Sequence, residues 1–166
     1  ISEWPFQTNP EIAERIYEIA LSLANVNRES IKRILDLGIG EWIYFKIFSE
    51  VFSSLKEVIG IEKNGDSVER VKGKTTQEGS GREKVYEGDM NNLPEGIGRD
   101  FDIVSILYPN AFINMIDTER IEGEKLRKLS EDISKRLSQE GLFIITIGTE
   151  EIDLEGNKEA TSYLEK

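Results

Sequence analysis

The sequence predicts an α/β fold in which a parallel β-sheet carries helices on both faces. Short apolar runs of strand length alternate with amphipathic segments of helical length along most of the chain. Two glycines join the first of these runs to the segment that follows it. At 166 residues the chain fits one domain with a buried core. We therefore treat residues 1–166 as a single domain, with an arm and a helix in residues 1–30 and the core in residues 31–147.

The composition removes several kinds of chemistry. The chain has no Cys and no His, so disulfides, thiolate zinc sites, cysteine nucleophiles and imidazole bases are excluded, and we predict no metal site. Any proton transfer must use Asp, Glu, Lys, Tyr or water. The net charge of −11 opposes binding to a phosphate backbone, so a small molecule or a protein is the better partner.

The sequence also predicts where the protein is found. No apolar run approaches the ~20 residues that span a bilayer, and the N-terminus lacks the basic and apolar regions of a signal peptide. We expect a cytoplasmic protein that does not associate with membranes. Abundant Glu, Lys and Ile, with only three Gln, favour a heat-adapted source.

The N-terminal part is expected to be an aromatic arm, residues 1–8, followed by a helix that runs to about Asn25. Thr8 and Glu11 fit a capping box at its start. Helical spacing predicts one apolar face, formed by Ile12, Ile16, Ile19 and Leu23.

The first strand, residues 31–37, contains Asp36 and leads into the glycine turn. Gly38 and Gly40 would permit positive φ and let a ligand approach the backbone, and a following helix would offer free N–H groups to an anion. An ordinary tight turn between a strand and a helix fits these residues as well. Residues 41–55 then predict a helix that is apolar nearly all round, either deeply buried or partly an interface between copies of the chain.

The middle of the chain predicts two further strands. Residues 57–62 form a short apolar run, and a helix begins at Asn64. Residues 73–82 are polar and rich in glycine, which predicts an exposed loop. Residues 84–87 form the third strand.

The last part of the chain predicts two strands with a helix between them. Residues 101–107 form the fourth strand, which Pro109 ends because proline cannot donate to a β-ladder. Gly141 closes the following helix, and residues 142–147 form the fifth strand. The helix shows an apolar stripe of Leu126, Leu129, Ile133 and Leu137.

An acid stands at the end of each of the first three strands, where parallel sheets bind ligands: Asp36, Glu62 and Asp89. Glu62 lies about one βαβ unit after the glycine turn, where a carboxylate accepts hydrogen bonds from both hydroxyls of a ribose. Each acid alone also fits a solvated loop carboxylate or a helix cap. Three at matching places favour a ligand site.

The chain resembles the class I S-adenosylmethionine-dependent methyltransferases over residues 31–147. The resemblance implies a three-layer Rossmann-like fold with strand order 3-2-1-4-5. Five segments carry it in the family's order and spacing: residues 35–40 (Leu-Asp-Leu-Gly-Ile-Gly), 58–62 (Val-Ile-Gly-Ile-Glu), 87–90 (Glu-Gly-Asp-Met), 101–104 (Phe-Asp-Ile-Val) and 137–142 (Leu-Ser-Gln-Glu-Gly-Leu).

The resemblance also implies a cofactor, S-adenosylmethionine, and a role for each site residue. Gly38 and Gly40 would approach its methionine part, and Asp36 would hold its ammonium group directly or through water. Glu62 would accept the ribose hydroxyls and Asp89 the adenine amine. The adenine ring would also pack on Met90. A sulfonium already activates the methyl group, so the protein mainly aligns the acceptor.

The chain departs from the family in two places. Trp42 stands where a third small residue is usual, and its indole would pack in the core, line the pocket or block it; we expect core packing. The second departure is the end of the chain. After residue 147 only nineteen residues remain, too few for the family's last helix and hairpin, so the C-terminal hairpin is missing or reduced.

The nicotinamide fingerprint fits this chain less well. Ile43 stands at the position of its third glycine, which disfavours a dinucleotide.

The methyl acceptor is poorly marked. Tyr108 and Asn110 follow the fourth strand and are candidates to touch it, although a packed tyrosine in a turn fits them too. We therefore predict a methyltransferase with an unidentified acceptor. Two alternatives remain: a non-catalytic binding or scaffold protein of the same fold, and a nucleotide-dependent oxidoreductase.

Overall fold

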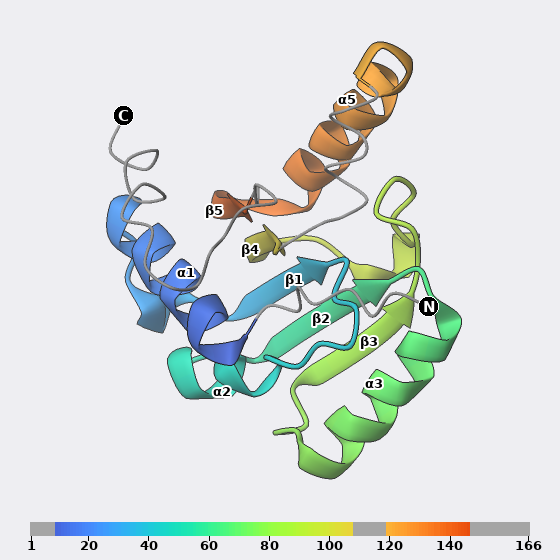
Figure 1. Cartoon of the computed structure of the whole chain (residues 1–166). Helices are drawn as coiled ribbons and strands as arrows, with labels where there is room; N and C mark the ends of the chain where they lie inside the picture. The colour runs from blue at the N-terminus through green and yellow to red at the C-terminus, as the bar shows by residue number, and fades with distance from the viewer. Residues whose placement is uncertain (1–8, 108–118, 147–166) are drawn as a thin grey trace, which may run out of the picture.

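A five-stranded parallel sheet lies at the centre of the computed structural model, which describes residues 9–107 and 119–146 (Figure 1). The strand order is β3-β2-β1-β4-β5, and every neighbouring pair is parallel, so the predicted fold and order are confirmed. The strands are β1 (Arg33–Leu37), β2 (Glu57–Glu62), β3 (Glu83–Glu87), β4 (Phe101–Ile106) and β5 (Leu137–Ile145).

Helices cover both faces of the sheet, which makes three layers (Figure 1). Alternate residues of β1 and β2 enter two separate cores: Ile34 packs with α1, α2 and α3, whereas Leu35 packs with η2 and α5. No helix among the described residues is long and apolar enough to cross a bilayer. The helices are α1 (Pro10–Leu23), η1 (Arg28–Ser30), α2 (Lys46–Val51), α3 (Gly65–Glu78), η2 (Glu95–Ile97) and α5 (Glu119–Arg136).

Helix α1 differs from the prediction in its N-cap residue and in the face that it buries. Its N-cap is Asn9, whose side chain accepts a hydrogen bond of 2.8 Å from the backbone N–H of Glu11; Thr8 lies outside the described residues. The predicted apolar face was wrong at Ile19 and Leu23, which are 37% and 74% exposed, whereas Ile16 is partly buried against the core. The buried residues are instead Ala13, Tyr17 and Leu21.

The predicted helix over residues 41–55 is reduced to the six residues of α2. Trp42 has a φ of 44°, in the left-handed region, and a right-handed helix cannot pass through such a residue. Turns therefore lead from Gly40 to Lys46. Of the apolar residues predicted to surround this helix, Ile43 is 39% exposed, whereas the others are buried inside the chain: Trp42, Tyr44, Phe45, Ile47, Phe48, Val51 and Phe52.

Helix α3 is longer than predicted and occupies most of the expected loop, residues 73–82. Asn64 caps its first turn by accepting a hydrogen bond of 3.1 Å from the N–H of Ser67. Val71 and Thr75 are buried on the face that meets the sheet, so packing extends the helix through Gly73. Tertiary contacts here outweigh the weak helix propensity of glycine.

Gly141 lies inside β5 and does not close α5, which ends at Arg136. The pairing with β4 is irregular between Phe101 and Ile103. A Cβ atom on Gly141 would stand 2.8 Å from the carbonyl oxygen of Phe101. The glycine therefore permits close approach of two strands, a role that sequence spacing alone could not distinguish from a helix cap.

Candidate functional site

The glycine turn lies at the carboxyl end of β1, where the rule for parallel sheets places a ligand. Gly38 and Gly40 have φ values of 69° and 54°, so both adopt the left-handed conformation that glycine tolerates best. The N–H of Gly38 donates to the carbonyl oxygen of Ile61 at 2.8 Å. The turn therefore remains attached to β2 after the strand pairing ends.

Glu62, at the end of β2, reaches this turn. One carboxylate oxygen accepts the N–H of Gly40 at 2.9 Å, and the other accepts the N–H of Asn64 at 2.9 Å. A carboxylate has about four lone-pair positions, so two remain for further donors. The side chain is partly buried and lies beside the backbone of the turn, where Gly38 and Gly40 are also partly buried.

Asp89 and Met90 bring the end of β3 to the same place. Asp89 accepts the backbone N–H of Asn91 at 2.9 Å and forms an ion pair of 3.0 Å with Lys63. These contacts, the N–H of Asn91 first, hold the pKa of Asp89 below its usual range. The Met90 methyl carbon lies 3.1 Å from where a Cβ of Gly38 would stand. Five predicted residues, Gly38, Gly40, Glu62, Asp89 and Met90, thus converge at the ends of three strands.

Asp36 has a different environment. Its carboxylate is fully buried and accepts three hydrogen bonds, all from neutral donors. Burial raises its pKa from 3.8 to about 6, although the three hydrogen bonds act in the opposite direction. The donors are the indole N–H of Trp42 at 2.9 Å, the hydroxyl of Tyr44 at 2.7 Å and the hydroxyl of Ser105 at 2.8 Å.

Trp42 packs in the core, as predicted. Its indole is 1% exposed, and its ring centroid lies 6.2 Å from that of Phe45 and 5.8 Å from that of Phe48. The far end of the indole lies 3.2 Å from where a Cβ of Gly60 would stand. The indole thus lies against β2, on the face of the sheet that α1 and α2 cover.

Sequence reasoning missed the hydroxyl groups around Asp36. Tyr44 was treated as an apolar helix residue, and Tyr17 was not assigned to the buried face. Tyr17 of α1 and Ser105 of β4 share a buried hydrogen bond of 2.7 Å. The usable signal was Ser105 itself, because a hydroxyl in an apolar central strand requires a buried partner.

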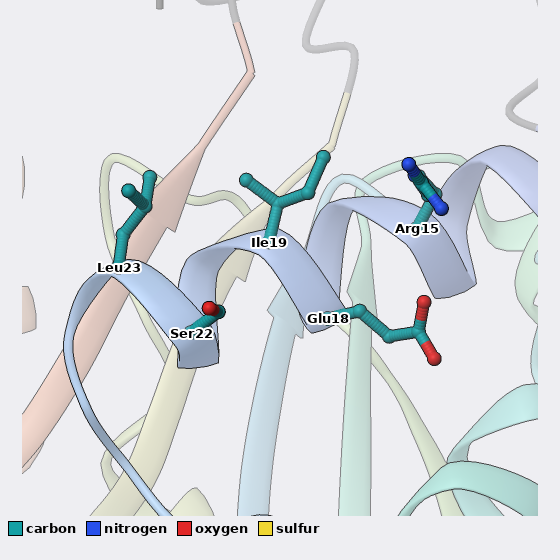
Figure 2. A pocket seen from close by; sticks show the side chains of 5 residues that line it. All are labelled: Arg15, Glu18, Ile19, Ser22 and Leu23. Carbon is teal, nitrogen blue, oxygen red and sulfur yellow. The ribbon is translucent and has the colours of Figure 1, made fainter.

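A shallow pocket on the outer side of α1 is lined by side chains of that helix alone, and Figure 2 shows Arg15, Ile19 and Leu23 projecting from one side of it. None of its residues belongs to the predicted site. Within the described ranges, no group of three acidic residues could hold a metal ion. Tyr108 and Asn110, the candidates for contact with the acceptor, lie outside the described residues.

The family model described as a methyltransferase domain matches residues 28–162 of the chain. This range contains the glycine turn and all five strands. No protein with a curated description matches the sequence.

Solved methyltransferase structures share the fold at low sequence identity. An S-adenosylmethionine-dependent methyltransferase from Clostridium acetobutylicum matches with a TM-score of 0.62 and 18% identity, over 85% of this chain and 50% of its own. PKMT2 from Rickettsia typhi, solved with AdoHcy, matches with a TM-score of 0.59 and 19% identity, over 82% and 24%. The sugar N-methyltransferase KedS8 from Streptoalloteichus matches with a TM-score of 0.58 and 19% identity, over 86% and 48%.

The chain therefore spans half or less of the length of these three structures. Their shared fold agrees with the observed strand order, and the family match covers more than half of the chain. The resemblance to the class I S-adenosylmethionine-dependent methyltransferases is confirmed, and the chain belongs to the family of methyltransferase domains.

Proposed function

We propose that this chain binds S-adenosylmethionine at the glycine turn and transfers a methyl group from it to an acceptor. One observation carries the proposal: two left-handed glycines hold bare backbone beside the Glu62 carboxylate, at the end of a central parallel strand. Such a cradle suits a ligand with hydroxyl donors and a group that needs close backbone approach. Membership of a methyltransferase family makes that ligand S-adenosylmethionine.

Each converging residue has a role in this proposal. Gly38 and Gly40 face the methionine part, and the free lone pairs of Glu62 accept the ribose hydroxyls. Asp89, whose low pKa keeps it ionised at neutral pH, accepts the adenine amine. The adenine ring packs on Met90. All five residues come from the carboxyl ends of β1, β2 and β3.

Asp36 receives a different assignment from its sequence-based one. Its carboxylate has no exposed surface, and three donors already surround it. Direct contact with the ammonium of the cofactor would require that surface. We therefore place Asp36 behind the turn, where it sets the geometry of the backbone.

Catalysis in this proposal depends on position. When bound, the sulfonium of the cofactor supplies an activated methyl group. The chain's task is to align an acceptor behind that group and to exclude water. No histidine is required for this task, which suits the composition. Tyr108 and Asn110 remain candidates for contact with the acceptor, because they follow the end of β4.

The location and the acceptor class rest on composition. We keep a cytoplasmic location and a heat-adapted source as proposals. The charge of −11 favours a small molecule or a protein as the acceptor over a nucleic acid. We expected copies of the chain to associate through residues 41–55. Of the apolar residues predicted for that contact, only Ile43 is exposed.

Calorimetry with S-adenosylhomocysteine tests the proposal. We expect heat of binding and a rise in melting temperature, because a ligand that binds only the folded state stabilises it. A nicotinamide dinucleotide serves as the control and is expected to give neither. Absence of both signals with S-adenosylhomocysteine would refute the proposal, and binding of the dinucleotide would support the oxidoreductase alternative.

A non-catalytic scaffold is the other alternative. An indole that blocks the cofactor pocket would favour it, and the burial of Trp42 among Phe45 and Phe48 argues against that arrangement.

A further inference from the structure

Trp42 has a backbone conformation that is costly for its residue type. Its φ of 44° lies in the left-handed region, which bulky side chains rarely adopt. Such strain persists only where the surrounding structure imposes it, and it gathers at functional sites. Trp42 directly follows the glycine turn, so the strain lies beside the proposed cofactor site.

Two side chains that follow the turn bond to the strand that precedes it. The indole N–H of Trp42 and the hydroxyl of Tyr44 both donate to the same carboxylate oxygen of Asp36, at 2.9 Å and 2.7 Å. The turn is therefore closed from behind by two side-chain hydrogen bonds that span six and eight residues. All three side chains are at least 96% buried, so water does not compete for these bonds.

The other oxygen of Asp36 fixes the carboxylate against the rest of the sheet. It accepts the hydroxyl of Ser105 on β4, which in turn shares a hydrogen bond with Tyr17 of α1. The titratable groups that face Asp36 among the described residues are Tyr17 and Tyr44, whose pKa values burial raises well above the usual one. Both stay neutral at physiological pH, and no cation takes part.

We propose that Trp42 and Tyr44 are positioning residues that lock the glycine turn through Asp36. The lock holds the backbone of the turn in the arrangement that receives the cofactor. It replaces the third small residue that the family's turn usually has. The inference rests on the proposed function for its effect on ligand binding, but the lock itself belongs to the free protein.

The lock would reduce the conformational entropy that the two glycines lose when a ligand binds. Gly38 and Gly40 each permit many backbone conformations, so an unsupported turn would lose more entropy when a ligand orders it. A turn that is already fixed avoids that loss, which is the usual gain from pre-organisation. Here the front of the turn is held by Glu62 and Ile61. The back is held by Asp36.

Amide hydrogen exchange in the free protein measures the lock without any ligand. Four turn amides have acceptors, those of Gly38, Ile39, Gly40 and Trp42. In Tyr44→Phe and in Trp42→Phe we expect these amides to exchange at least about fivefold faster, as loss of one buried hydrogen bond implies. The amides that pair β2 with β3 should exchange as in the wild type.

Phe48→Leu is the matched control. Phe48 is fully buried and touches the Trp42 ring, but it has no bond to Asp36. It should loosen the core without selective exchange at the turn. Turn amides that are unaffected in both test variants, or accelerated equally by Phe48→Leu, would overturn the proposal.

Binding of S-adenosylhomocysteine supplies the second measurement. We expect Tyr44→Phe to raise the Kd about fivefold to tenfold, and Phe48→Leu to change it less than about twofold. Equal affinity of Tyr44→Phe and the wild type would overturn the link between the lock and the cofactor. If the wild type does not bind at all, the proposed function fails, whereas the exchange experiment still decides whether the lock exists.

Discussion

Asp36 is a buried carboxylate that only neutral donors surround. Its pKa of about 6 shows that the three hydrogen bonds do not fully replace water around the charge. Such a group is costly to keep ionised inside a protein. Its presence behind the glycine turn therefore fits a role in holding the backbone of that turn.

The substitution Asp36→Asn should change how stability depends on pH. Between pH 4 and 6 folded Asp36 holds its proton more tightly than the unfolded chain does, so the wild type's free energy of unfolding falls as pH rises, until the folded group is also ionised above about pH 6. The amide side chain of the variant does not titrate. We expect the variant's stability relative to the wild type to rise by roughly 1.4 kcal/mol per pH unit over this range and then level off. Urea unfolding at several pH values measures this, and parallel curves would contradict it.

Replacement of Glu62 or Asp89 by Ala should weaken binding of S-adenosylhomocysteine. Each change leaves donor groups of the ligand without a partner, which costs on the order of 1–3 kcal/mol. Calorimetry measures the loss. Glu69→Ala is the control, because Glu69 is an exposed residue of α3 that pairs with Lys72, away from the turn. If both site variants bind as the wild type does, the site assignment is wrong even though the family stands.

Replacement of Trp42 by Gly separates a core indole from one that obstructs the pocket. Glycine accepts the positive φ without strain, but the variant loses a buried indole and its bond to Asp36. We expect the free energy of unfolding to fall by about 3–5 kcal/mol and the affinity for S-adenosylhomocysteine to fall as well. Calorimetry below the melting temperature of the variant checks this. A gain in affinity would show that the native indole blocks the site.

At the scale of elements, Gly141 and Gly73 have different surroundings, although the sequence gives no sign of this difference. Gly141 lies where β5 meets β4, with a backbone oxygen 2.8 Å from the position of a Cβ. Gly73 lies inside α3, with no atom outside its own stretch of helix within 4 Å of that position. The two glycines therefore form a matched pair for a test of the fold.

Alanine at these two positions should shift stability in opposite directions. Gly141→Ala forces two strands apart and should lower the free energy of unfolding by about 1–3 kcal/mol. Gly73→Ala should raise it by about 0.5–1 kcal/mol, because alanine favours the helix interior. Chemical denaturation of both variants measures the change. A stabilising Gly141→Ala would mean that the strands do not approach as closely as described.

The limits of sequence-based prediction also appear at this scale. Residues 57–62 were predicted with the observed bounds of β2, because a strand buried on both faces has a clear apolar pattern. The helix predicted over residues 41–55 was wrong because no local sequence pattern indicates that Trp42 adopts a positive φ. The buried side of α1 failed for a similar reason, since the bond between Tyr17 and Ser105 joins residues 88 positions apart.

At the scale of the whole molecule, the strand order was predictable from the resemblance to the methyltransferase family, and the convergence of the acids was predictable from the parallel sheet. βαβ units bring the carboxyl ends of parallel strands to one edge of a sheet. The sequence could not show which of the three acids is buried and which are partly exposed. Glu62 and Asp89 are partly exposed, whereas Asp36 lies on the inner side. That difference depends on which side chains fold over each acid.

The position of β1 in the sheet also has a consequence for the order of assembly. β1 pairs with β2 through Arg33 and Glu57, 24 residues apart, but with β4 through Ile34 and Ile103, 69 residues apart. Distant pairings close later because longer loops cost more entropy. Gly38, Gly40 and the acids that we propose face the ligand thus emerge and pair early, while Ser105 reaches Asp36 only when β4 docks. We expect the nascent chain to acquire the parts of the proposed binding site before it acquires the bond that ties them to the rest of the sheet.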